Sequence, residues 1–132
     1  PVLDPDACET PTNADMPITS SGTYTPTLSN LSNISSATAA ECQYMRVGNT
    51  VTVSGKFTAT CSGVTTGNAL VMTLPIASNI SEDQDVAGVF SGANGGAGYV
   101  YGSTATDSAR VVFINGPLSS SAYYFTFTYQ II

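Results

Sequence analysis

The stretch "ECQYMRVGNTVTVSGKF", residues 41–57, decides the fold class. Apolar and polar residues alternate on both sides of Gly48-Asn49, a dipeptide typical of a two-residue turn between antiparallel strands. A loop of this length fixes the register, so Tyr44 is expected opposite Val53, and the strands should form a hairpin. No residue of this hairpin is obviously suited to catalysis.

The two sides of this hairpin differ in character. The side predicted to face the core carries Cys42, Tyr44, Val51, Val53 and Phe57, with Arg46 at its loop end. The opposite side carries Gln43, Met45, Val47, Thr50, Thr52 and Ser54. Because that second side is half apolar, we expect another subunit or a neighbouring segment to cover it.

Further short runs bounded by Gly, Pro, Asn or Ser predict the other strands. These runs are residues 69–75, 86–92, 97–103, 109–115 and 122–132. In the last run one face carries Tyr123, Phe125, Phe127, Tyr129 and Ile131. No long segment has a 3.6-residue period, so helix is limited to a turn near residues 36–41. About eight strands at this spacing predict an all-β domain: a single antiparallel β-sandwich with a jelly-roll-like topology.

The N-terminal residues 1–22 differ from the rest of the chain. They hold four prolines and four acidic residues without periodicity, which predicts an extended arm or linker. The β-sandwich knob domain is then expected over residues 23–132. Pro26 interrupts its first alternating run, which indicates an edge strand or a bulge.

Composition excludes several classes of partner. Of 132 residues only 9% are charged, and the net charge is −6. Arg46, Lys56 and Arg110 are the three basic residues, too few to neutralise a run of phosphates, so nucleic-acid binding is disfavoured. No apolar run approaches the length of a membrane span, so membrane insertion is not expected.

The residue types needed for common catalytic and metal sites are scarce. The chain has no histidine, which excludes Ser-His and Cys-His nucleophile pairs. Cys8, Cys42 and Cys61 lack the paired spacing of a zinc site and are expected to be free thiols. No cofactor is indicated.

The densest acidic cluster is "NISEDQD", which contains Glu82, Asp83 and Asp85 between two predicted strands. Hard cations prefer clustered oxygens, but this spacing matches no calcium loop, so a solvated acidic loop is the favoured interpretation over a metal site. An enzyme would need a deep pocket containing two of these carboxylates or Asp107. We therefore expect no catalytic residues.

A glycine-rich segment, "GANGGAG" at residues 92–98, precedes Tyr99 and Tyr101. It lacks the lysine and the following helix of a phosphate-binding loop, so a tight turn is expected. The two tyrosines are the best candidates for stacking on a sugar, with Glu82, Asp83 and Asp85 as further glycan contacts. Cross-strand packing and interface filling are the alternative roles for the same rings.

Four motifs occur together in this chain: "SGTYTPTLSNLSNIS", "CQYMRVGNTVTVSGKF", "LPIAS" and "AYYFTFTYQII". In this order they resemble the C-terminal β-knob domain of bacteriophage tail-fibre and other virion proteins, over residues 21–132. The resemblance implies a non-enzymatic structural protein without a cofactor, commonly a homotrimer, on the exterior surface of the virion. It carries over no catalytic residue.

The site of this knob on the particle stays open. As a tail-fibre tip it would bind a receptor such as a host cell-surface glycan; as a capsid decoration protein it would bind the shell. The chain is short for the family, so it is expected to be either an excised tip or a small complete protein, and Pro1, which would follow removal of an initiator methionine, favours the second. We expect residues 1–22 to bind other virion proteins. The alternative function is a carbohydrate-binding module.

Overall fold

The computed structural model describes residues 18–62, 67–94, 96–114 and 117–132. These residues form ten strands and a single 3-10 turn. The elements are β1 (Thr19–Tyr24), β2 (Leu28–Ser32), β3 (Ile34–Ala39), β4 (Cys42–Val47), β5 (Thr50–Cys61), β6 (Gly67–Met72), η1 (Asp83–Asp85), β7 (Val86–Gly92), β8 (Ala97–Ser103), β9 (Ser108–Ile114) and β10 (Ser121–Gln130).

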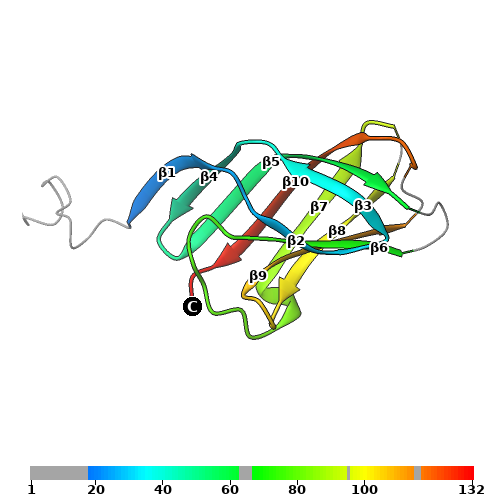
Figure 1. The fold of residues 1–132 in the computed structure, drawn as a ribbon. Helices are drawn as coiled ribbons and strands as arrows, with labels where there is room; N and C mark the ends of the chain where they lie inside the picture. Colours follow the sequence, from blue (N-terminus) through cyan, green and yellow to red (C-terminus); the bar gives the residue numbers. More distant parts are fainter. Residues whose placement is uncertain (1–17, 63–66, 95, 115–116) are drawn as a thin grey trace, which may run out of the picture.

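All described strand pairs are antiparallel, and they join into one curled sheet. Its strand order is β1-β4-β5-β10-β7-β8-β9-β6-β2, with β3 paired to β5. The last strand in the chain, β10, lies in the middle of this order, between β5 and β7 (Figure 1). The sheet is therefore assembled from two groups of strands that β10 joins.

The segment from β2 to β3 connects the β6 end of the curled sheet back to β5. The long strand β5 pairs with β4 near its start and with β3 near its end, while β2 pairs with β6 at the far end of the sheet. Between β2 and β3 the chain turns at Asn33, whose φ is 57°. The Asn33 carbonyl accepts a hydrogen bond from the Ser62 N–H (2.9 Å), and its side-chain amide donates to the Gly67 carbonyl (2.6 Å). Asn33 thus ties the end of β5 to the start of β6.

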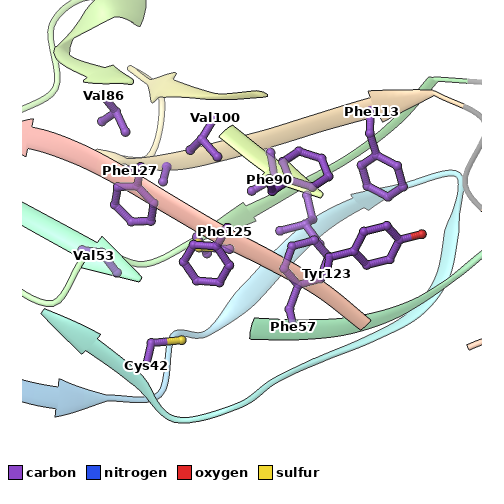
Figure 2. Packing of buried hydrophobic residues seen from close by; sticks show 14 of the residues in the cluster. Cys42, Val53, Phe57, Val86, Phe90, Val100, Phe113, Tyr123, Phe125 and Phe127 are labelled. Atoms are coloured by element: carbon purple, nitrogen blue, oxygen red, sulfur yellow. The ribbon is translucent and has the colours of Figure 1, made fainter. Parts of the chain in front are cut away.

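The inward side of the sheet encloses an aromatic core (Figure 2). Its rings come from four central strands: Phe57, Phe90, Phe113, Tyr123, Phe125, Phe127 and Tyr129. Tyr123 stacks on Phe57 with ring centroids 5.1 Å apart, and Phe90 meets Phe113 edge to face at 5.3 Å. These geometries are the ones that aromatic pairs prefer, so the core is held by directional contacts as well as by burial.

Glycines opposite the rings make room for this core. Along one row of the register, Gly55 lies opposite Phe125, which is opposite Phe90, which is opposite Gly98. A Cβ at Gly98 would collide with the Phe90 ring and with a backbone carbonyl. The two adjacent phenylalanines of this row are therefore flanked by glycines, which allows bulky rings to pack inside a strongly curved sheet.

One end of the core is covered by the segment that links β6 to β7, residues 73–85. Ile80 of this segment is buried, and its N–H donates to the Asp107 carboxylate at 2.9 Å. The Tyr129 hydroxyl accepts from the Ile76 N–H (3.1 Å) and donates to the Ile76 carbonyl (2.7 Å). Burial raises the pKa of Tyr129 to about 12. The hydrogen bonds of Tyr129 thus fix this segment to β10. The Tyr129 hydroxyl remains protonated at neutral pH.

The structure confirms the main features expected of the hairpin. Tyr44 pairs with Val53 and Arg46 with Val51, and Gly48 takes a φ of 60°, as the first residue of a type II′ turn does. All the predicted core positions of the hairpin are buried except Tyr44, which is half-buried, and the opposite side is exposed. The predicted strands 86–92 and 97–103 are β7 and β8 with the same bounds.

Three expectations about elements were wrong. Residues 34–39 form β3, and no helical turn lies at 36–41, because pairing with β5 outweighs the helix propensity of Ala and Glu. Ten strands replace about eight, because the first alternating run contributes to three strands: β1 ends before Pro26, and the left-handed φ of Asn33 separates β2 from β3. Residues 19–22, assigned to the arm, belong to β1, which pairs with β4. Residues 1–17 lie outside the described part of the chain.

The domain is all-β and antiparallel, as predicted, and a single curled sheet forms it. The curl is that of a half-barrel and is compatible with a β-sandwich (Figure 1). Cys42 and Cys61 are free, buried thiols whose pKa values are raised by burial, while Cys8 lies outside the described residues.

Candidate functional site

The outward side of the sheet is an extended surface that the fold offers to a partner. It consists of the alternate residues of β4, β5, β10, β7, β8 and β9, and most of them are Ser, Thr, Ala, Val or Tyr. At the outward strand positions that the structure describes, Lys56 and Arg110 carry the only formal charges. Because this surface carries few charges, covering it with a partner costs little desolvation free energy.

Large apolar side chains are exposed on this side. They are Met45, Val47, Val89, Tyr99, Ile114 and Tyr124. Met45 is 59% exposed and lies in a shallow hollow of about 530 Å³ over β1, β4 and β5. Hydroxyl and amide groups of Ser21, Gln43 and Thr52 line the same hollow. An apolar centre with a polar rim is the usual anatomy of a protein–protein contact.

A second part of the outward side holds the tyrosine pair predicted from the sequence. Tyr99 and Tyr101 both project outward from β8, with ring centroids 5.7 Å apart and planes inclined by 31°. Tyr99 is 55% exposed and borders a depression of about 460 Å³ lined by Gly98, Val112 and Ile114. The two rings, Val112 and Ile114 form an apolar surface that is open to solvent.

Arg110 lies beside this pair, and the sequence interpretation had given it no role in a site. It is opposite Tyr101 of β8 on one side and Val71 of β6 on the other. Its Nε is buried and has no hydrogen-bond partner. Alternation within "ARVVFIN" places Arg110, Val112 and Ile114 on one side of β9. The position of Arg110 opposite Tyr101 depends on the register of β8 against β9, which the sequence pattern does not give.

The acidic residues 82–85 form a small capped turn at the end of the sheet. The Asp85 carboxylate accepts hydrogen bonds from the Ser81 N–H and the Glu82 N–H, each 2.9 Å long, and from the Ser81 hydroxyl at 3.1 Å. These bonds, chiefly the one from Glu82, lower the pKa of Asp85. Glu82 and Asp83 are exposed. One carboxylate oxygen of Asp85, Oδ2, is thus used to order its own turn.

The structure does not bring the acidic turn onto the tyrosine surface. A Cβ at Gly102 would lie 2.9 Å from the Glu82 carbonyl and 3.1 Å from the Asp83 carbonyl, so this part of the turn packs against the inward side of β8, while Asp85 lines a separate depression with Ala87 and Thr128. Tyr99 and Tyr101 project from the outward side of the same strand. Across residues 18–62, 67–94, 96–114 and 117–132, no group of three or more Asp, Glu, Cys or His side chains could hold a metal ion. Asp107 accepts a hydrogen bond from the Ile80 backbone.

A scan against models of protein families, a search of curated proteins and a search of solved structures each found no match to this chain. In the part of the chain that the structure describes, no helix is long and apolar enough to span a membrane.

Proposed function

We propose that this chain is a non-enzymatic structural protein of a bacteriophage virion, an oligomeric β-knob on the exterior of the particle. The observation that carries the proposal is the outward side of the sheet, where Met45 and five other large apolar side chains are exposed on a nearly uncharged surface. The order of motifs that resembles phage tail proteins supports the same function. The jelly-roll-like sandwich topology is part of this proposal.

Self-association is the central claim, and a homotrimer is the expected state. We place the subunit contact on the hollow around Met45, because it combines an exposed thioether with hydroxyl and amide groups that can pair across an interface. Multi-angle light scattering at micromolar concentration should give three times the chain mass. Met45→Lys should shift the mass toward one chain, while Thr104→Lys, in the exposed β8–β9 turn, should not. A monomeric native protein would contradict the proposal.

Attachment to the particle is proposed to use the N-terminal arm. Because β1 begins at Thr19, the deletion that tests this idea must end at residue 17 to leave the sheet intact. The truncated protein should keep its melting temperature and oligomeric mass and should no longer bind virions. Binding of the truncated protein to empty capsids or tails would overturn this part of the proposal. Binding to host cells would favour a tail tip over a capsid decoration.

A second candidate function, carbohydrate binding, is favoured by a specific observation. Tyr99 is half exposed and borders an open depression, and its ring centroid lies 5.7 Å from that of Tyr101. Sugar rings present apolar C–H faces that stack on such rings. The acidic turn takes no part in this candidate site, since it packs on the other side of β8. The two functions are compatible, because the Met45 hollow and the tyrosine pair occupy different strands.

A further inference from the structure

We propose that Arg110 and the Tyr99–Tyr101 pair form one binding site for a carboxylate-bearing sugar. The inference rests on the second candidate function and names its ligand class. Tyr101 and Arg110 are direct cross-strand partners on β8 and β9, and Tyr99 is the next outward residue of β8. Side chains in such positions are within reach of one another. One ligand can therefore meet an aromatic face and a guanidinium at the same time.

The state of the Arg110 guanidinium is the first argument for an anionic ligand. Its Nε is buried without a hydrogen-bond partner, and no ion pair of Arg110 occurs within the described residues. A partly buried charge without a partner is unfavourable, and such groups in native proteins call for an explanation. A ligand carboxylate that engages the terminal nitrogens would supply the counter-charge that the described residues do not provide.

The surroundings of Arg110 are the second argument. Its nearest outward neighbours across the strands are Tyr101 and Val71, and Val71 is only 2% exposed. No carboxylate occupies the outward positions of β6, β8 or β9 to neutralise it. Apolar surroundings reduce screening by water, so a charge-assisted hydrogen bond here is stronger than one at an exposed arginine.

The chemistry of the ligand follows from the combination of one guanidinium with two tyrosine rings. The planar guanidinium matches a carboxylate with two parallel hydrogen bonds, while the tyrosine rings match the apolar face of a pyranose ring. Uronic acids and sialic acids carry both features in one residue. A neutral sugar would leave Arg110 unpaired, and a simple carboxylate would leave the rings uncovered.

The test uses the full chain and isothermal titration calorimetry in about 0.15 M salt, where long-range attraction between exposed charges is screened. The probes are oligoglucuronate, oligosialate, neutral dextran and sodium acetate. Either acidic oligosaccharide should bind, and dextran and acetate should bind at least about tenfold more weakly, since each lacks one half of the recognition. Which acidic probe binds identifies the source of the carboxylate.

Variants separate the site from general charge effects. Arg110→Gln and Arg110→Lys should each weaken binding by about tenfold or more, because lysine keeps the charge but not the planar fork. Lys56→Gln, which removes the other outward charge, should leave affinity unchanged. Tyr99→Ala should lower affinity. Because the Tyr99 side chain is exposed, this variant should fold normally, so it tests the site even if an Arg110 variant is unstable.

Four outcomes would overturn the proposal. Full affinity in Arg110→Gln would remove the guanidinium from the site. An equal loss in Lys56→Gln would show non-specific attraction. Equal binding of dextran would refute the acidic specificity and leave carbohydrate binding intact, whereas no binding of any saccharide would refute both. The virion proposal is tested separately by the oligomeric mass.

Discussion

The inward and outward sides of the sheet are made by alternate residues of the same strands, yet they have different properties. On β5, Val53 is fully buried in the aromatic core, while the adjacent Thr52 is exposed and its hydroxyl lies 3.4 Å from that of Thr128 on β10. Inward residues hold the fold through packing. Outward residues contribute little to packing and are therefore available for partners, so a substitution should reveal by its effect which side it occupies.

The strongest contrast is expected between two neighbouring residues of β5. Val53→Asp places an unpaired carboxylate among buried rings and should lower the free energy of unfolding by about 4 kcal/mol or more, or prevent folding. Thr52→Asp should change it by only about 0.5 kcal/mol. Chemical denaturation of both variants measures the difference. Equal losses would show that the register of the β4–β5 hairpin is wrong.

A second contrast concerns two glycines with different neighbours. Gly98→Ala should cost about 1–3 kcal/mol, because the new methyl group would meet the Phe90 ring and a backbone carbonyl. Gly67→Ala is the matched control, since a Cβ added there would have no atom within 4 Å and its φ is not left-handed. Thermal melts followed by circular dichroism compare them. The glycine–aromatic row would be refuted if both variants melted alike.

Two tyrosines of β10 give a smaller contrast. Tyr129→Phe removes both hydrogen bonds to Ile76 and should lower the free energy of unfolding by about 1–2 kcal/mol, because the partly buried Ile76 N–H is left without a partner. Tyr124→Phe changes an exposed ring and should be nearly neutral. The raised pKa of Tyr129 adds a pH effect with a definite sign. Its stabilisation is complete below pH 10 and declines as the pH rises through about 12, because the unfolded chain ionises first.

The tyrosine experiment has a clear failure. If Tyr129→Phe unfolds at the same denaturant concentration as the native chain at pH 7, the hydrogen bonds do not hold residues 73–85 against β10. A stability profile that rises between pH 10 and pH 12 would contradict the direction of the pKa shift.

The smallest effect is expected in the acidic turn at residues 82–85, at the end of the sheet. Asp85→Asn should weaken the turn at neutral pH, since the carboxylate there accepts two backbone N–H bonds. The lowered pKa of Asp85 means that this stabilisation is present well above 3.8 and is lost as the pH falls below it. Melting temperatures of variant and native chain should therefore differ at pH 7 and converge in acid. Asp83→Asn is the control, and a difference that persists in acid would refute the assignment.

The hairpin shows what could be predicted from sequence. A two-residue turn and a period of two are local properties, so the register of β4 against β5 followed from residues 42–54 alone. The division between β2 and β3 could not be predicted in this way, because it depends on the left-handed φ of Asn33 and on its bonds to Ser62 and Gly67. Those partners are distant in sequence and are brought near by the pairing of β2 with β6 and of β3 with β5.

The candidate site was predictable to a similar extent. Alternation placed Tyr99 and Tyr101 on one side of a strand, and the structure shows them as an outward pair. The role of Arg110 could not be inferred, because its nearness to Tyr101 requires the pairing of β8 with β9. The acidic turn is close to the tyrosines in sequence, but the curl of the sheet carries it to the inward side of β8.

The central place of β10 has a consequence for how the chain reaches this fold. Hairpins such as β4–β5 and β7–β8 bring together residues close in sequence and should form early, in microseconds. Strand β10 must then find β5 and β7, whose partner residues lie far back along the chain. Until it docks, both strands expose an unpaired edge beside a half-formed core. Folding should therefore be slow for a chain of this size, and its dominant kinetic hazard is association of these edges between chains.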